Sequence, residues 1–287
     1  MSKLLVVGSL HYDIMVAAHH RPEKGETVIG TGCSYKFGGK GGNQAVSAAQ
    51  AGIEVAFSGA VGDDDQGKWL LDVLKNHAVD TTYIEVIGGT PSGMSVAITD
   101  AEGDYGAVVL SNANTHINGE QFANDELWKE VGMVLLQNEL PEQINLHAAT
   151  EAKKRGITVC INAAPAKTLS PDLIKCIDLL VVNGVEARDM SGITVDSLQN
   201  AAAAAQALGQ IYPTVVVTAG EMGVAYADNS EESKTLEAEK IELVSTHGAG
   251  DCFMGMLCAS LLKGESLGAS VNNANKAAAL HVSKKAD

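Results

Sequence analysis

The sequence predicts an α/β fold with a mostly parallel central sheet, packed with helices, from which a small second sheet projects. Short β-branched runs alternate with amphipathic, alanine-rich stretches from about residue 38 onward, as in chains whose helices pack on a parallel sheet. Two segments, residues 12–37 and 92–110, interrupt this alternation. Polar residues follow several apolar runs, at the edge where open α/β sheets bind ligands.

The strands and helices of the main unit follow from this alternation. The apolar runs predict core strands at residues 4–7, 55–59, 133–136, 158–161, 179–182 and 214–218. The amphipathic stretches predict helices at residues 42–51, 66–76, 141–155, 195–208, 250–262 and 266–283. Gly156, Gly209 and Gly264 mark helix ends. Residues 229–240, rich in Glu, Ser and Lys, predict a solvated surface loop.

The two interrupting segments predict a separate β unit. Residues 94–99 and 105–109 flank a polar stretch at 100–104, which indicates a hairpin. We therefore expect an α/β domain of residues 1–11, 38–91 and 111–287 and a β lid of residues 12–37 and 92–110. A lid of this kind excludes water from a transfer reaction, and the alternative is a pair of structural edge hairpins.

Composition narrows the classes of partner. A chain of 287 residues, 46% of them hydrophobic, can bury a large core. The formal net charge of −15 argues against a nucleic-acid partner, because phosphate-backbone binding needs a basic stripe. This negative charge does not argue against a nucleotide site, since backbone amides, a few lysines and a divalent cation can hold phosphates.

The cysteines and the apolar runs bear on the compartment. Cys33, Cys160, Cys176, Cys252 and Cys258 form neither a CxxC pair nor a zinc-ligand pattern, which indicates reduced core residues. No signal-peptide pattern and no apolar run of membrane-spanning length is present. We expect a cytoplasmic protein with no membrane partner.

The most informative motif is the HGAGD run at residues 247–251. Small residues at a helix start leave backbone N–H groups free for an anion, and Asp251 lies beside them. Phosphoryl transfer uses such a pair, with donors for the moving group and a carboxylate that takes the hydroxyl proton. The alternative is a glycine-rich turn with Asp251 as a helix cap.

A second glycine run, GGKGGNQ at residues 38–44, also precedes a predicted helix. Glycines here would let a ligand approach the main chain, and Asn43 can donate to and accept from hydroxyls. The run matches neither the P-loop nor the dinucleotide fingerprint. The alternative is a tight strand-to-helix turn.

Polar residues at strand ends predict one crevice. Asp13 lies just beyond the first strand. Similar positions recur at Asn138-Glu139, at residues 162–165, at residues 183–186 and at residues 218–221. Each alone is typical of a cap or turn, whereas five together favour a site.

In order along the chain, these motifs resemble the ribokinase-like (PfkB) family of sugar kinases, and within it the ribokinase branch most closely. The resemblance spans Gly8-Ser9 with Asp13, PEKGETV at 22–28, GGKGGNQA at 38–45, Gly62-Asp63-Asp64, QNELP at 137–141, NAAPA at 162–166, NGVE at 183–186, Thr218-Ala219-Gly220 and GAGD at 248–251. It implies a three-layer α/β sandwich with a β-sheet lid that forms a homodimer contact. It also implies ATP as the phosphoryl donor, a primary sugar hydroxyl as the acceptor and Mg²⁺ at the phosphates.

The resemblance also implies roles for individual residues. Asp251 would be the base, and the amides of Gly248, Ala249 and Gly250 would form the anion hole. The residues implied to hold the sugar are His11, Asp13, Gly39, Lys40, Asn43 and Glu139. Asn183 and Glu186 would order Mg²⁺ and its waters. Thr218, Gly220 and Asn275 would lie along the nucleotide.

The chain departs from the family pattern in three places. His11 replaces an asparagine expected to touch the sugar, which leaves the substrate open; the alternative is that His11 turns away and only caps the strand end. Ser245-Thr246 replaces an Asp-Thr pair whose Asp helps to bind potassium. The sequence ends at Asp287, before the loop that supplies the other potassium ligands. We expect a weak or absent potassium site.

Several functions fit these residues. The leading one is an ATP-dependent pentose kinase, most simply one that converts D-ribose to ribose 5-phosphate. A nucleoside kinase fits less well because it needs an apolar or aromatic slot for the base, and only 4% of residues are aromatic. A phosphosugar kinase also fits less well, because it needs extra Lys or Arg near the sugar and the lid offers only Arg21, Lys24 and Lys36. A kinase of another small sugar remains open. A non-catalytic sugar-binding protein on the same fold is disfavoured because a pure binder has no use for Asp251.

Overall fold

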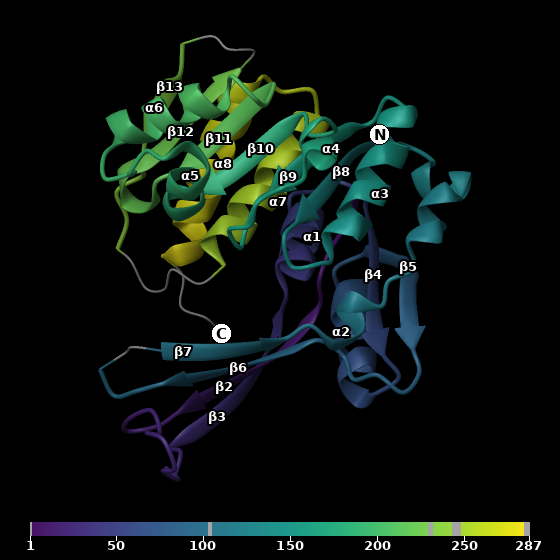
Figure 1. Ribbon diagram of the computed structural model, residues 1–287, viewed down its shortest axis with the longest axis vertical. Coiled ribbons are helices and arrows are strands. Elements are labelled where there is room, and N and C mark those ends of the chain that lie inside the picture. The colour runs from purple at the N-terminus through teal and green to yellow at the C-terminus, as the bar shows by residue number, and fades with distance from the viewer. Residues whose placement is uncertain (1, 103–104, 229–231, 243–247, 284–287) are drawn as a thin grey trace.

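The computed structural model describes residues 2–102, 105–228, 232–242 and 248–283. A nine-stranded sheet lies between two layers of helices, and a four-stranded sheet projects from one end (Figure 1). This architecture confirms the predicted α/β class, with a mostly parallel central sheet and a small separate sheet.

The central sheet places the first strand in its interior. The strand order is β13-β12-β11-β10-β9-β8-β1-β4-β5. Pairing is parallel from β5 to β11, and β12 and β13 continue antiparallel. The bounds are β1 Lys3–Val7, β4 Val55–Gly62, β5 Val79–Ile87, β8 Val131–Gln137, β9 Thr158–Asn162, β10 Leu179–Asn183, β11 Thr214–Thr218, β12 Gly223–Asp228 and β13 Lys234–Glu237.

This order creates a switch point at β1. The chain proceeds from β1 to β4 and β5 on one side, then crosses to β8 and builds outward on the other. Val7, the last residue of β1, pairs with Ser58 of β4 and Leu136 of β8. Ligands of open α/β sheets bind at the carboxyl ends of strands at such a point.

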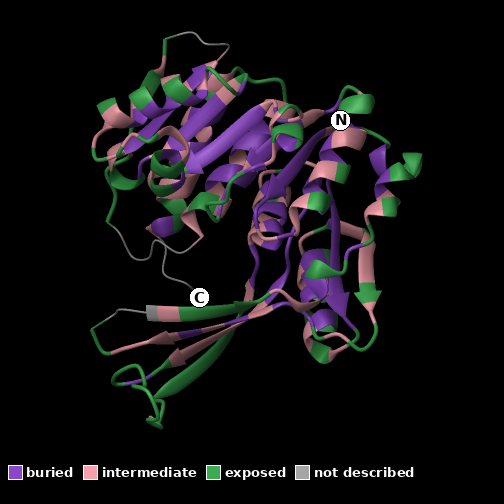
Figure 2. Ribbon diagram, viewed as in Figure 1, coloured by how far each residue is buried: buried purple, intermediate pink, exposed green. Residues whose placement is uncertain are grey.

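Helices cover both faces because alternate side chains of each buried strand point to opposite sides. Leu4 and Val6 join one core with α1 (Lys40–Gln50), α2 (Asp65–Asn76), α7 (Ala249–Leu262) and α8 (Leu267–Val282). Leu5 and Val7 join the other core with α3 (Glu142–Lys154), α4 (Pro171–Ile174), α5 (Gly184–Ser191), α6 (Leu198–Leu208) and the short helices η1 (Asn112–Thr115), η2 (Gly119–Ala123) and η3 (Asp125–Trp128). Figure 2 shows the buried sheet between them.

The small sheet has two chemically different faces. Its order is β3 (Gly32–Gly38), β2 (His11–Ala17), β6 (Met94–Thr99) and β7 (Tyr105–Leu110), and β6–β7 is the predicted hairpin. One face carries Lys36, Asp13 and Ser95 in a row. The other, here called the apolar face, carries Phe37–Tyr12–Met94–Leu110 and Tyr35–Ile14–Val96–Val108 in successive rows. Several of these side chains are exposed (Figure 2).

Some predicted elements differ in the structure. The helix predicted at 195–208 begins instead at Leu198, because the Ser197 side chain caps it. The loop predicted at 229–240 contains strand β13. Cys33 is exposed rather than in the core, and Cys176 and Cys252 are partly exposed; all five cysteines are free thiols. Within the described ranges, no helix is long and apolar enough to span a membrane.

Candidate active site

The start of α7 is an uncovered helix N-terminus. Gly248 precedes the helix in the left-handed region, at φ 75°, and no side chain caps the first turn. A Cβ added at Gly250 would meet nothing within 4 Å among the residues that the structure describes. The first-turn N–H groups of Ala249, Gly250 and Asp251 therefore have no acceptor within the helix and no side-chain cap among the described residues, as an anion site requires.

Asp251 lies in this first turn and is held by two amides from α1. Gln44 Nε2 donates to Asp251 Oδ1 at 2.9 Å, and Asn43 Nδ2 lies 3.4 Å from Oδ2. Burial raises the pKa of the Asp251 carboxyl above its ordinary value, and nearby Glu139 adds to this. The charge of Lys40 and the two amides act in the opposite direction.

A close contact between α1 and α7 brings these groups together. A Cβ at Gly255 would lie 2.4 Å from Ser47 Oγ and 2.6 Å from the backbone nitrogen of Ala48. Ser47 Oγ also donates to the carbonyl of Cys252 at 3.2 Å. Only a glycine at 255 lets the two helix starts lie this close.

The glycine run at the start of α1 is tightly packed. A Cβ at Gly41 would lie 2.6 Å from Gly8 Cα, and one at Gly42 would strike Phe37 and Leu10. Gly39, at φ 88°, has no room beside the carbonyl of Ser9. The connection between β1 and β2 (residues 8–10) and Phe37 of β3 fill the space where a Cβ would lie, so packing by itself requires glycine at these positions. The approach of a ligand to this main chain stays a prediction. The predicted sugar contact of Gly39 stays a prediction.

Unlike α7, the start of α1 already holds a carboxylate. Glu139 Oε2 accepts from the backbone N–H of Lys40 at 2.8 Å and from Ser9 Oγ. This places Glu139, which follows β8, directly beside the residues that follow β1. Ser9 was not among the predicted site residues, although the Gly8-Ser9 pair was a signal for it.

His11 and Asp13 lie at the base of the small sheet. His11 is 4% exposed, and its Nε2 is one of the buried polar atoms without a hydrogen-bond partner in the described chain. Asp13 Oδ1 accepts from Ser95 Oγ at 2.6 Å, a partner that the motifs did not indicate. A Cβ at Gly38 would collide with the Asp13 carboxylate.

Asn183 and Glu186 form a capping box at the start of α5. Asn183 Oδ1 accepts from the N–H groups of Val185 and Glu186, and Glu186 Oε2 accepts from the N–H of Asn183 at 2.7 Å. Burial raises the pKa of Glu186, while the Asn183 N–H and the charge of Lys40 oppose the rise. The charge of Lys40 thus lowers the pKa of both Asp251 and Glu186.

These contacts limit how a metal could bind. The amide oxygen of Asn183 and one carboxylate oxygen of Glu186 are already engaged, which leaves the other Glu186 oxygen as a hard donor. Within the described ranges, no cluster of three or more His, Cys, Asp or Glu side chains could hold a metal ion. The residues thus fit Mg²⁺ that keeps most of its waters, rather than a closed cage.

The predicted nucleotide residues lie farther along the sheet. Thr218 Oγ1 donates to the carbonyl of Val182 at 3.4 Å, and Gly220, at φ 59°, has open space on its Cβ side within the described chain. Asn275 Nδ2 on α8 donates to the carbonyl of Glu237 at 2.9 Å. Among the described residues, no hydrogen bond joins these three to Asp251, whose partners are Asn43 and Gln44. The potassium positions Ser245, Thr246 and His247, and Asp287, lie outside the described residues.

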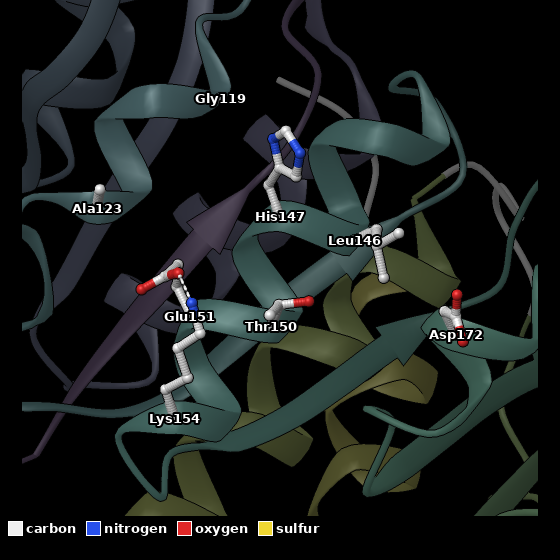
Figure 3. Close-up of a pocket in the computed structure, with 8 residues that line it drawn as sticks. All are labelled: Gly119, Ala123, Leu146, His147, Thr150, Glu151, Lys154 and Asp172. Carbon is white, nitrogen blue, oxygen red and sulfur yellow. Dashed lines mark hydrogen bonds and ion pairs between the residues drawn. The ribbon is translucent and has the colours of Figure 1, made fainter.

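A separate groove lies between α3, η2 and α4 (Figure 3). Its volume is about 510 Å³, and Thr150, His147 and the paired Glu151 and Lys154 line it. None of its lining residues belongs to the predicted site.

The full length of the chain matches a known family. The sequence profile described as pfkB family carbohydrate kinase covers residues 1–287. The chain belongs to this family. It is a phosphotransferase that acts on an alcohol group, which agrees with the resemblance seen in the motifs.

Individual pfkB relatives are similar over nearly their whole length. Ribokinase of Bacillus subtilis is 36% identical over 98% of this chain and 93% of its own. Deoxyribokinase of Salmonella typhi is 30% identical over 98% of this chain and 93% of its own. The structure of Arabidopsis thaliana ribokinase complexed with ribose and ATP superposes with a TM-score of 0.91, at 27% identity, over 99% of this chain and 94% of that one.

Proposed function

We propose that this carbohydrate kinase transfers the γ-phosphoryl group of ATP to the primary hydroxyl of a pentose, converting D-ribose to ribose 5-phosphate. The observation that carries the proposal is the start of α7, where a partly buried carboxylate lies beside backbone N–H groups that no described side chain caps. The ribose and ATP named for the Arabidopsis relative support the same pair of substrates.

Asp251 acts as the general base in this proposal. The sugar O–H bond breaks and its proton passes to Asp251, while the sugar oxygen forms a bond to the γ-phosphorus. The bond from that phosphorus to the bridging oxygen breaks, and ADP leaves. The amides of Gly248, Ala249 and Gly250 stabilise the charge on the phosphoryl oxygens. A raised pKa makes Asp251 a stronger base than an exposed aspartate.

The residues at the base of the small sheet hold the sugar. Asp13, Glu139 and Asn43 accept from or donate to its hydroxyls, and His11 offers its unpartnered Nε2. The main chain at Gly39 and the amine of Lys40 complete this set. Since the charge of Lys40 acts on both Asp251 and Glu186, it also suits the space where the sugar meets the phosphates.

Asn183 and Glu186 order the metal and its waters, and Thr218, Gly220 and Asn275 lie along the nucleotide. Bound Mg²⁺ would neutralise the phosphate charges. The small sheet closes over the sugar as a lid, and its apolar face forms a homodimer contact. The reaction takes place in the cytoplasm, where free thiols such as those of this chain stay reduced.

A second candidate is a kinase of another small sugar. His11, in place of an amide, changes the hydrogen bonds available to one hydroxyl, and a deoxyribokinase is among the relatives at 30% identity. A nucleoside kinase from Burkholderia thailandensis shares the fold at 18% identity, which supports the fold alone.

The test is ATP consumption with Mg²⁺ on D-ribose, 2-deoxy-D-ribose, other pentoses, hexoses, nucleosides and sugar phosphates. Each is run in sodium and in potassium, with the wild type and His11→Asn. We expect turnover on D-ribose, little stimulation by potassium, and a change of about tenfold in the ribose to deoxyribose ratio of kcat/KM in the variant. Strong turnover on another sugar would make that sugar, and not ribose, the substrate. No ATP consumption with any compound of the panel would overturn the kinase assignment.

A further inference from the structure

Gln44 is a fully buried amide with both of its polar atoms engaged. Its Nε2 donates to Asp251 Oδ1 at 2.9 Å and to Asn162 Oδ1 at 3.1 Å. Its Oε1 accepts from Gln137 Nε2 at 2.9 Å. The roles proposed above do not use this residue.

The network around Gln44 fixes which way its amide faces. Asn162 Nδ2 donates to the carbonyl of Val181, so its oxygen faces Gln44. A flipped Gln44 amide would set its oxygen against the oxygens of Asn162 and Asp251, and its nitrogen against the nitrogen of Gln137. Such a reversal would leave buried groups unpaired, which is costly. Asn162, at the end of β9, therefore holds the Gln44 N–H groups toward Asp251. Gln137 of β8 does not by itself fix this orientation, since its own Oε1 has no hydrogen-bond partner among the described residues.

The two oxygens of Asp251 consequently differ. Oδ1 has a well-formed hydrogen bond from Gln44, whereas Oδ2 has only the 3.4 Å contact with Asn43. We propose that Gln44 is a positioning residue that holds Oδ1 of Asp251 and so makes Oδ2 the oxygen that takes the proton from the acceptor hydroxyl. This inference rests on the proposed role of Asp251 as the base.

The charged groups that face Asp251 are Lys40, at the start of α1, and Glu139, after β8. They remain in place when Gln44 changes. A hydrogen bond to the charged form of a carboxyl lowers its pKa, so losing the Gln44 donor raises the pKa of Asp251 further.

The experiment compares Gln44→Glu and Gln44→Met with the wild type and Ser47→Ala. The methionine keeps the length without polar atoms and therefore tests the loss of the donor alone. The glutamate keeps an acceptor for Gln137 but replaces the donor with a second carboxyl, whose charge adds repulsion to the loss of the donor. Ser47 bonds Cys252 across the same helix contact and is the matched control. The pKa of Asp251 is read from the ¹³C shift of its carboxyl, assigned by the signal lost in Asp251→Asn. Rapid-quench phosphorylation of D-ribose by MgATP is followed against pH, and thermal unfolding reports folding.

In folded Gln44 variants we expect the pKa of Asp251 to rise by about one pH unit or more, and the acid limb of the pH–rate profile to move to higher pH by the same amount. The plateau rate should be about 10- to 100-fold lower. Ser47→Ala should leave both unchanged. If either folded Gln44 variant keeps the wild-type Asp251 pKa and rate profile, the positioning role is overturned. If Asp251→Asn retains turnover, the base assignment fails instead, whatever the Gln44 variants show.

Discussion

Asp251 is a partly buried carboxylate at the first turn of a helix, with one amide bonded to it and a second at long range. Its burial has opposite consequences for chemistry and for folding. A raised pKa strengthens it as a base, while the ionised form at neutral pH lowers the free energy of unfolding because the unfolded chain solvates the charge better.

For Asp251→Asn we expect kcat to fall about 100- to 10,000-fold and Tm to rise by about 2 °C or more. Because the folded pKa is raised, the native state binds the proton more tightly, so the wild type gains stability as pH falls through that pKa. The stability gap between the two proteins should therefore shrink with falling pH, while the wild-type rate falls over the same interval. Calorimetry and turnover between pH 4 and 8 test this, and an Asn variant that is less stable at pH 7 would contradict it.

Several site contacts could not be predicted at the residue scale. Gln44 meets Asp251 across 207 positions, Ser9 meets Glu139 across 130, and Ser95 meets Asp13 across 82. Local patterns indicated that strand ends carry polar groups, but not which pairs would bond. Such pairs depend on strand order and helix contacts, which a single sequence does not contain.

At the scale of elements, the buried strands and long helices were predictable because their apolar pattern is continuous. Strand β5 was missed because Asp80, Thr81, Thr82 and Glu85 interrupt its apolar residues, as is common in a strand at the edge of a sheet. The short helix α5 was missed because Asn183 and Glu186, which form its capping box, were assigned to a ligand site and not to the start of a helix. Both glycine-rich helix starts were predicted, but the structure shows that they differ. The glycines at the start of α1 are tightly packed, whereas Gly250 in α7 has free space on its Cβ side within the described chain.

This difference predicts opposite results for two alanine substitutions. Gly41→Ala should lower the free energy of unfolding by about 1–3 kcal/mol, because the new methyl meets Gly8 Cα. Gly250→Ala should keep wild-type stability, since its Cβ has free space within the described chain, but reduce kcat roughly 100-fold by filling the anion hole. Urea unfolding and steady-state rates measure both, and equal losses of stability would refute the distinction.

At the scale of the whole molecule, the small sheet lacks a second layer over part of its apolar face. Tyr35 and Val108, at opposite edge strands, are 58% and 64% exposed, and Trp69 of α2 packs only near Tyr12 and Phe37. Exposed apolar patches of this kind mark interfaces. We expect a second copy of the chain, with the same face, to supply a matching surface.

We expect Val108→Lys to convert a dimer into a monomer of 29.8 kDa. Val109→Lys is the control, because Val109 is also exposed but pairs with Ser95 on the opposite face. Light scattering coupled to size exclusion gives the masses. A wild-type monomer at micromolar concentration, or dissociation by both substitutions alike, would argue against a dimer through this face.

The interior position of β1 also matters while the chain is being made. This strand leaves the ribosome before the other strands of the sheet, yet its β8 neighbour begins only at Val131. Until then β1 can pair only with β4, and one edge of an almost wholly apolar strand presents open N–H and C=O groups. Nascent chains of this topology therefore carry an aggregation-prone edge until β8 has been made, a stage at which chaperone binding would be most useful.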